Sequence, residues 1–399
     1  MISNALKSYT TITAGYWGFT LTDGALRMLV VLYFHSIGYS PFEVASLFLF
    51  YEFFGIITNL VGGWAATRLG LNVTLHIGMA LQVIALAMLA FTDTLSVPFV
   101  MFAQALSGIA KDLNKMSAKA GVKTILASSQ DSKLFQWVAV LTGSKNALKG
   151  AGFFLGGALL QFVGFHDALI VLAIGLSLIL IITFTLLPQE LGKTKRKAKF
   201  SQIFSNIPAI NWLAAARFFL FASRDIWFVI ALPVFLFEQL HWSFTQVGSF
   251  IALWVIGYGF IQSISPQLIR KHQASGHTVK WLAFVLATIP ALIALSLILS
   301  HNASLSMIIG LMVFGVIFAL NSAFHSYLIL AYSEHDKVAM NVGFYYMANA
   351  SGRLTGTVIS GLAYQALGLV GCLWISAGFI VVAGLLSFKL PEQRDFVIN

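Results

Sequence analysis

The chain has 399 residues, of which 58% are hydrophobic and 10% are charged, far below the roughly 25% charged residues of an ordinary soluble domain. This composition indicates a membrane protein that crosses the bilayer many times. Its single cysteine, Cys372, excludes a disulfide framework and a thiolate metal site. The formal net charge is +10, but the placement of the basic residues argues against a nucleic-acid partner.

Breaks at Gly, Pro and polar residues divide the chain into about twelve apolar segments, each long enough to cross roughly 30 Å of hydrocarbon as a helix. They predict an all-α integral membrane fold. The expected helices cover residues 10–34, 41–66, 73–92, 96–119, 133–163, 167–187, 207–237, 243–268, 280–300, 304–332, 338–366 and 368–388.

Basic residues are distributed very unevenly between the expected loops. If the amino terminus is cytoplasmic, Lys and Arg gather in the inner loops, and the outer loops hold neither. Those outer loops lie around 35–40, 93–96, 164–167, 238–242, 300–303 and 366–369. Because cytoplasmic loops carry the excess of Lys and Arg, we expect both termini to be cytoplasmic.

One basic polar run, PQELGKTKRKAKFSQ at 188–202, lies midway along the chain. It predicts an amino-terminal six-helix bundle (1–190), a basic cytoplasmic linker (191–206) and a carboxy-terminal six-helix bundle (207–399). This layout resembles that of major facilitator transporters, whose halves rock about a midplane site. The stretch GGWAATRLG (62–70) resembles their gating loop through Gly62, Arg68 and Gly70, although the family's acidic position holds Thr67.

Charged residues inside the expected helices avoid every third helix, which faces lipid in that fold. The interiors of 73–92, 168–187, 281–300 and 368–388 contain no Asp, Glu, Lys or Arg. The helices over 243–268 and 304–332 contribute polar groups such as Gln262, Asn321 and His325.

The remaining helices hold eight cations and four anions. The cations are Arg27, Lys111, Lys115, Lys145, Lys149, Arg217, Arg224 and Arg353, and the anions are Asp23, Glu52, Asp112 and Asp225. A charge at the bilayer centre costs at least about 2.5–3.5 kcal/mol, so each of these residues suggests a functional site. Because the excess is positive, we expect the cavity to bind a polyanion.

Spacing along the helices suggests partners for some of these charges. Asp23 and Arg27 are four residues apart and are expected either to neutralise each other or to act separately. Arg224 and Asp225 are adjacent and point in different directions, so Arg217 is the better expected partner for Asp225. Lys111 and Lys115 are expected to extend toward the cytoplasmic interface.

The expected substrate ligands combine lysines, arginines and two amides. Lys145 and Lys149 stack on one helix face beside Asn146, and Asn349 stacks on Arg353. The other expected ligands are Arg27, Arg217, Arg224, Lys111 and Lys115. For the two stacked lysines, pairing with Asp23, Glu52 or Asp112 remains the alternative.

The stretch GSKNALKG lacks the G-x-x-x-x-G-K-[ST] motif of a nucleotide-binding loop, so no ATPase and no cofactor are expected. Transport must then use an ion gradient or exchange, and Asp23 and Glu52 are the candidate proton carriers. Four glycines of this helix, Gly150, Gly152, Gly156 and Gly157, are expected to allow close helix packing.

Three runs, FTLTDGALRMLVVLYFH (19–35), QALSGIAKDLNKMSAKAG (104–121) and LTGSKNALKGAGFFLGG (141–157), resemble the ArsJ-type organoarsenical efflux permeases of the major facilitator superfamily. FLFYEFFGIITNLVGGWAA (48–66) extends this similarity, which covers nearly the whole chain. The resemblance implies a monomeric inner-membrane transporter in bacteria that exports 1-arseno-3-phosphoglycerate and so confers arsenate resistance. It also implies a functional link to the glyceraldehyde-3-phosphate dehydrogenase that makes this ester.

A general organophosphate or organic-anion antiporter, exchanging for phosphate or protons, fits the same charges and stays open. An integral-membrane enzyme or a sensor is disfavoured, because the sequence shows no nucleophile–base motif and no soluble output domain. Multidrug export is disfavoured because buried basic residues would repel cationic drugs.

Overall fold

The computed structural model describes residues 2–69, 71–92, 95–126, 131–187, 207–272, 275–299, 303–333 and 338–391. Within these ranges, the side chains of 2–6, 9, 60–69, 71, 119–126, 131–143, 266–272, 303, 330 and 338–340 lie outside the description. All regular structure in the described ranges is helical, which confirms the predicted all-α fold.

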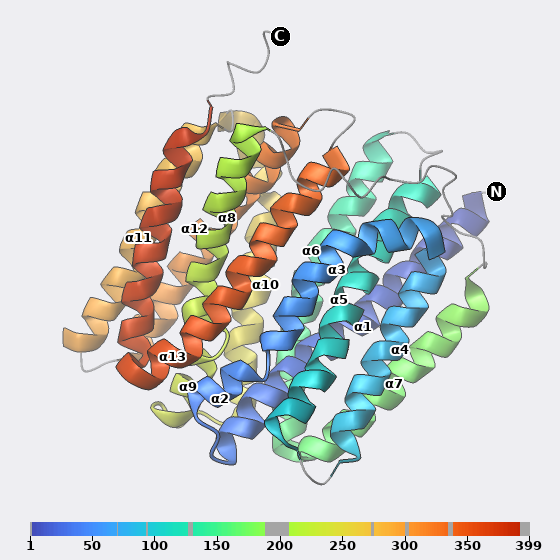
Figure 1. Cartoon of the computed structure of the whole chain (residues 1–399), viewed down its shortest axis with the longest axis horizontal. Helices are drawn as coiled ribbons and strands as arrows, with labels where there is room; N and C mark the ends of the chain where they lie inside the picture. The colour runs from blue at the N-terminus through green and yellow to red at the C-terminus, as the bar shows by residue number, and fades with distance from the viewer. Residues whose placement is uncertain are drawn as a thin grey trace. The chain divides into compact units, whose positions relative to one another are not determined.

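The helices follow the predicted segments closely (Figure 1). They are α1 (Ile2–Ser36), α2 (Pro41–Ser46), α3 (Leu49–Leu69), α4 (Leu71–Ala90), α5 (Val97–Leu126), α6 (Asp131–Phe162), α7 (Phe165–Leu186), α8 (Pro208–Phe228), α9 (Ala231–Glu238), α10 (Phe244–His272), α11 (Gly276–Leu299), α12 (Ala303–Ala331), α13 (Val338–Leu386) and the 3-10 helix η2 (Ser387–Lys389). In the described residues, eight helical stretches are long and apolar enough to cross a membrane. The expected twelve crossings and the cytoplasmic termini remain predictions.

The start of α2 shows how the sequence sets a helix boundary. Ser40 accepts a hydrogen bond from the backbone N–H of Glu43, and the Glu43 carboxylate accepts one from the backbone N–H of Ser40. Pro41 occupies the first turn, where a missing N–H costs nothing. This reciprocal cap satisfies two donors that the helix itself leaves unpaired.

A proline explains why the predicted segment 207–237 is divided into α8 and α9. Pro233 has no N–H to donate to the carbonyl group of Val229, so the helix cannot continue through this turn. α8 ends at Phe228, and α9 starts at Ala231. The backbone N–H of Ala231 donates to the hydroxyl of Ser360 on α13, 3.1 Å away, so this break is bonded to a neighbouring helix.

The element α13 comprises two helices, predicted over 338–366 and 368–388, that meet at a kink at Gly368. The φ of Gly368 is 65° and its ψ is −167°, a conformation that residues with a Cβ rarely adopt. Glycine therefore permits the sharp change of direction inside α13.

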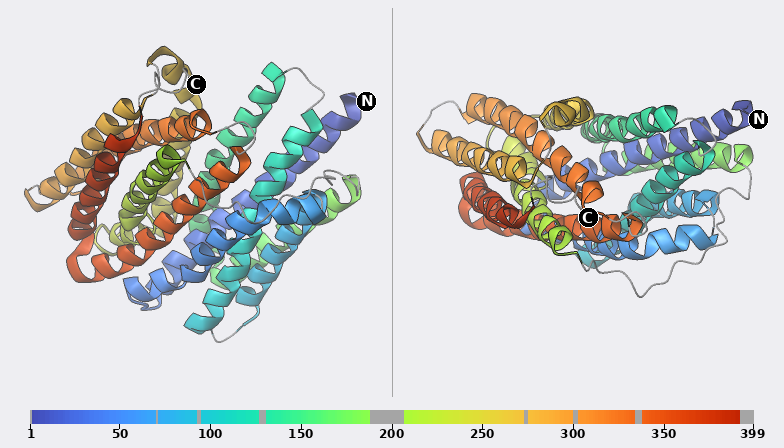
Figure 2. Two further views of the ribbon diagram at one scale, coloured as in Figure 1. Left: turned by 45° about the horizontal axis from the view of Figure 1, so that its top comes forward. Right: turned by 90° about the horizontal axis from the view of Figure 1, so that it is seen from above.

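The chain divides into two compact units, and each is described by itself. The first comprises Met1–Tyr33, Phe50–Phe200 and Ser243–Ile256. Within it, α4 packs between α5 and α7 (Figures 1 and 2). The second comprises Phe34–Leu49, Ser201–Trp242 and Gly257–Asn399, and there α13 packs on α8, α11 and α2. The predicted bundle and linker boundaries, 1–190, 191–206 and 207–399, remain predictions, and the linker lies outside the described residues.

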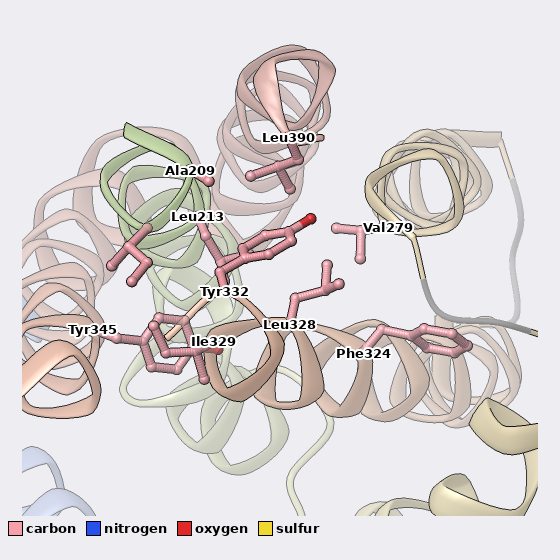
Figure 3. Packing of buried hydrophobic residues seen from close by; sticks show 10 residues of the cluster. Ala209, Leu213, Val279, Phe324, Leu328, Ile329, Tyr332, Tyr345 and Leu390 are labelled. Atoms are coloured by element: carbon pink, nitrogen blue, oxygen red, sulfur yellow. The ribbon is translucent and has the colours of Figure 1, made fainter. Parts of the chain in front are cut away.

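A hydrophobic cluster in the second unit joins α8, α11, α12, α13 and the chain beyond η2. Figure 3 shows Val279, Leu328, Tyr332 and Leu390 converging in its centre. Burial raises the pKa of Tyr332 to about 12, so its hydroxyl stays protonated and donates to the carbonyl oxygen of Pro391, 3.0 Å away. The end of α12 is thereby bonded to the segment that follows η2.

Candidate functional site

An ion pair between α1 and α3 neutralises one of the predicted ligands in the first unit. Nη2 of Arg27 lies 3.2 Å from Oε1 of Glu52, and both side chains are buried. The structure records no ion pair between Arg27 and Asp23, which is one turn earlier on α1, so the expected neutralisation within that helix is wrong. The ion-pair partner of Arg27 is Glu52 on the neighbouring helix α3, and not the acid four residues earlier on α1.

Asp23 is instead bonded to a neutral group. Its Oδ1 accepts a hydrogen bond of 2.7 Å from the hydroxyl of Tyr51 on α3. The ring of Tyr51 also has the ammonium of Lys111 4.0 Å from its centroid and the guanidinium carbon of Arg27 at 5.3 Å. Tyr51 therefore joins α1, α3 and α5, a role that its sequence position inside an apolar run did not reveal.

Two lysines of α5, Lys111 and Lys115, lie against the acid between them. Asp112 is buried, and its Oδ1 lies 2.9 Å from Nζ of Lys115 while its Oδ2 lies 3.6 Å from Nζ of Lys111. Lys115 also donates to the amide oxygen of Asn59, 2.8 Å away. A carboxylate thus binds both lysines, and an amide also binds Lys115; their extension toward the cytoplasmic interface remains a prediction.

Glycines let α6 approach α1 and α10 closely. These contacts fix the position of the part of α6 that carries Lys145 and Lys149. A Cβ on Gly156 would lie 2.5 Å from the carbonyl oxygen of Ala25 on α1, and one on Gly152 would meet the α1 backbone at Leu21 and Gly24. Cβ atoms on Gly150 and Gly157 would strike the α10 backbone. The packing role predicted for these four glycines is confirmed.

Three polar residues of α6 precede these glycines in the sequence and are partly buried. Lys145, Asn146 and Lys149 all lie on α6, and Nζ of Lys149 is 5.7 Å from the ring centroid of Phe153. The acids offered as alternative partners, Asp23, Glu52 and Asp112, are bonded to Tyr51, Arg27, Lys111 and Lys115 as described above.

In the second unit, one acid serves two arginines. The fully buried carboxylate of Asp225 accepts a hydrogen bond of 2.7 Å from Nε of its neighbour Arg224 and one of 3.2 Å from Nε of Arg353 on α13. The expected pairing of Asp225 with Arg217 is wrong. Adjacent side chains on a helix diverge at Cβ, but the long arginine side chain turns back to reach its neighbour.

Arg217 is buried and surrounded by neutral groups. Its Nε donates to the amide oxygen of Asn349 at 3.0 Å, and its Nη1 donates to the carbonyl oxygen and the hydroxyl of Ser322 at 3.1 and 3.0 Å. Its guanidinium carbon lies 3.9 Å from the ring centroid of Phe221 and 5.0 Å from that of Tyr345. Among the described residues, no carboxylate forms an ion pair with Arg217.

Further polar side chains extend this environment along α10 and α12. The amide of Gln262 donates to the hydroxyl of Tyr258 at 2.9 Å and lies 3.3 Å from the hydroxyl of Ser322. Asn321 and His325 are both buried on α12. Sequence reasoning singled out three of these groups as polar residues in apolar helices, but it did not identify Tyr258 or Ser322.

The predicted gating residues cannot be placed in the same detail. Gly62 and Arg68 belong to α3, but their side chains lie outside the description, as does Gly70. No group of three His, Cys, Asp or Glu residues that could hold a metal occurs in the part of the chain that the structure describes.

Comparison with known proteins identifies the fold. A family model for the Major Facilitator Superfamily matches residues 12–326 and 213–395. No curated protein sequence matches the chain.

Several solved transporter structures are similar to the chain over nearly its full length. A bacterial homologue of the human drug peptide transporters PepT1 and PepT2 has a TM-score of 0.74 at 15% identity, covering 97% of this chain and 98% of that one. A bacterial homologue of the iron transporter ferroportin has a TM-score of 0.71 at 16% identity, with 96% and 98% covered. A mutant of the nucleoside transporter NupG has a TM-score of 0.76 at 14% identity, with 97% and 99% covered. At these identities the similarity shows the fold alone.

Proposed function

Because this chain belongs to the Major Facilitator Superfamily and is therefore a multi-pass transporter of a small molecule rather than an enzyme, we propose that its substrate is a polyanionic arsenate ester. The proposed ester is 1-arseno-3-phosphoglycerate, exported from the cytoplasm across the inner membrane of a bacterium. Export of this ester would confer resistance to arsenate. The similar solved structures include bacterial homologues of peptide and iron transporters and a nucleoside transporter, so the substrate is inferred from the residues of this chain.

The observation that carries the proposal is the buried guanidinium of Arg217, which has only neutral partners in the described residues. A cation in this position costs several kcal/mol unless an opposite charge meets it. The neutral partners fix the guanidinium but do not cancel its charge. A substrate oxyanion would supply the missing charge, and the planar fork of Arg matches the oxygens of a phosphate or arsenate.

The other cations favour a substrate with more than one anionic group. The Asp225 carboxylate faces both Arg224 and Arg353, so two cations share one acid in that cluster. In the first unit, Lys145 and Lys149 are partly buried beside Asn146. We propose all of these, with Asn349 and the cations Arg27, Lys111 and Lys115, as substrate ligands during the transport cycle.

The resemblance of the three sequence runs to organoarsenical permeases supports arsenic in the substrate. An arsenate ester with a phosphate at its other end has the two separated anionic groups that lysines and arginines suit. A carrier of trivalent arsenic would need soft thiolate ligands, whereas Cys372 is the only cysteine and is buried. The proposal includes a functional link to the dehydrogenase that forms the ester, and a monomeric carrier.

The second candidate is a general organophosphate or organic-anion antiporter that exchanges its substrate for phosphate or protons. It is favoured by the chemistry of the ligands, because guanidinium and ammonium groups bind phosphate as they bind arsenate. For proton coupling we propose Asp23 or Glu52. Asp23 is the better placed, because it is bonded to the neutral Tyr51 hydroxyl, whereas Glu52 is paired with Arg27.

Transport into everted membrane vesicles distinguishes the two substrates. Arsenate, glyceraldehyde 3-phosphate, NAD and glyceraldehyde-3-phosphate dehydrogenase are supplied outside, and arsenic accumulation is followed for the wild type and for Lys145→Ala/Lys149→Ala. Accumulation that requires the complete mixture and is lost in the double variant supports export of the arsenate ester. Uptake of 3-phosphoglycerate without any dependence on arsenate identifies the general antiporter instead.

A further inference from the structure

His325 lies beside the buried guanidinium that carries the proposed function. Arg217 donates to the backbone carbonyl and the hydroxyl of Ser322, and His325 follows Ser322 by three residues on α12. Residues three apart on a helix are surface neighbours, with Cβ atoms about 5–6 Å apart. Arg217 is thus bonded to the residue one turn before His325, which places its positive charge near the imidazole.

The imidazole has hydrogen-bonding capacity that the described residues do not use. His325 is 1% exposed, and its Nδ1 has no hydrogen-bond partner among them. Asn321, one turn earlier on α12, is fully buried, and both atoms of its amide are likewise unpartnered in the described part of the chain. Buried polar groups are nearly always satisfied, so these atoms together indicate a place for a polar ligand next to Arg217.

The groups that the packed helices place around Arg217 and Ser322, one turn before His325, are cationic or neutral. α8 contributes Arg217, α13 contributes Tyr345 and Asn349 to the guanidinium, and α10 contributes Tyr258. No described carboxylate forms an ion pair with His325. Among the described residues, Arg217 is the charged group whose contacts reach the turn of α12 that precedes His325.

We propose that His325 takes up a proton when an anion binds at Arg217 and releases it when the anion leaves. In the empty carrier, a second positive charge beside Arg217 would be repelled in a medium of low dielectric constant, so the imidazole stays neutral. A bound phosphate or arsenate group reverses the local charge and accepts a hydrogen bond from the new N–H. The proton comes from solvent and returns to it, so the one bond that forms and breaks is the N–H bond of the imidazolium.

The linkage is reciprocal: if the anion promotes protonation, protonation strengthens anion binding by the same factor. Imidazole is the side chain best suited to such a change near neutral pH. This inference rests on the proposed function, because it requires the ligand at Arg217 to be an anion. It adds a regulatory property, since binding then becomes tighter as the solution becomes more acidic.

Proton uptake during binding tests the inference with purified protein in detergent. Calorimetric titration with 3-phosphoglycerate, in two buffers of different ionisation enthalpy, gives the number of protons taken up per bound anion. The ligand's own phosphate titrates near pH 6, so the informative quantity is the difference between the wild type and His325→Gln. We expect the wild type to take up more protons, by as much as about one per anion, and its affinity to depend more steeply on pH.

A matched control is His76→Gln, which replaces a histidine of the first unit whose ring lies tilted against that of Phe184, with 5.4 Å between the ring centroids. This variant is expected to keep the wild-type proton number. Difference infrared spectroscopy of the wild type gives a second measurement that needs no variant at residue 325. Addition of 3-phosphoglycerate should produce imidazolium bands.

The outcomes separate this inference from the proposed function. Equal proton numbers in the wild type and His325→Gln, or the absence of imidazolium bands during saturable binding, would overturn the role of His325 and leave the anion transporter intact. A wild type that binds neither 3-phosphoglycerate nor inorganic phosphate would overturn both. A larger proton number in the wild type than in His325→Gln, with imidazolium bands, supports both.

Discussion

Arg27 of α1 pairs with Glu52 of α3 at 3.2 Å, while Asp23, one turn before Arg27, accepts a hydrogen bond from Tyr51. Two acids close to the same arginine therefore have different roles. Glu52 compensates a buried charge, whereas Asp23 is held by a neutral hydroxyl. This difference leads to the first two predictions.

Glu52→Gln should be much more destabilising than Asp23→Asn. Loss of the Glu52 charge leaves Arg27 buried without its ion-pair partner, at a cost of about 3 kcal/mol or more. An asparagine at 23 still accepts the Tyr51 hydrogen bond, so its cost should stay near about 1 kcal/mol. Unfolding of the purified variants in detergent measures the loss of stability in each. Equal losses of stability would contradict the assignment of Glu52 as the structural partner of Arg27.

Asp23→Asn should uncouple transport from protons while leaving substrate exchange in place. Its side chain cannot carry a proton, but the tyrosine contact that orders α1 and α3 is retained. In vesicles, the variant is expected to lose the stimulation that a proton gradient gives the wild type and to retain exchange of external for internal substrate. Asp167→Asn, an exposed acid in the first turn of α7, is the control. Full stimulation in Asp23→Asn would exclude Asp23 as the proton carrier.

Arg217→Lys should weaken anion binding by about tenfold or more, although it preserves the charge. A lysine has no planar fork, so it cannot bond Asn349, Ser322 and an oxyanion together. The measurement is the dissociation constant of 3-phosphoglycerate by calorimetry. Lys280→Arg, a change at a cation beside the rings of Trp281 and Phe388, provides the control. Unchanged affinity in Arg217→Lys would show that only the charge at this position matters.

Gly152→Ala should destabilise the first unit, because the added methyl group would meet the α1 backbone at Leu21 and lie 3.0 Å from Cα of Gly24. Separating two packed helices to admit a methyl group costs about 1–3 kcal/mol. The comparison is Gly175→Ala on α7, where a Cβ meets nothing within 4 Å and stability should change by no more than about 1 kcal/mol. Equal thermal stability of the two variants would contradict the close packing of α1 and α6.

Helix positions and glycine packing followed from local sequence features. Apolar length located the helices to within a few residues in most cases, and Pro233 and Gly368 account for the main irregularities. The small residues of α6 pointed to close helix contacts because only glycine lets two backbones approach so nearly. These properties depend on the residue and its immediate neighbours in the chain.

The partners of the buried charges did not follow from the sequence. Spacing left Asp23 with Arg27 as one of two alternatives and favoured Arg217 with Asp225. Glu52 and Arg353 come from other helices, and their positions depend on how those helices pack. Asp112 lies between Lys111 and Lys115 in the sequence, but the contact of Lys115 with Asn59 comes from another helix. Tyr51 and Ser322 are ordinary residues in apolar helices, and only the three-dimensional arrangement shows that each contacts a buried cation.

The most direct test of the anion-binding claim is equilibrium binding of 3-phosphoglycerate to the purified carrier, comparing the wild type with Arg217→Gln and with Lys145→Gln/Lys149→Gln. We predict saturable binding to the wild type that weakens as salt is added. Each variant should lose about tenfold or more in affinity while remaining folded. Wild-type affinity in both folded variants, or a wild type that binds apolar organic cations but not 3-phosphoglycerate, would contradict the account.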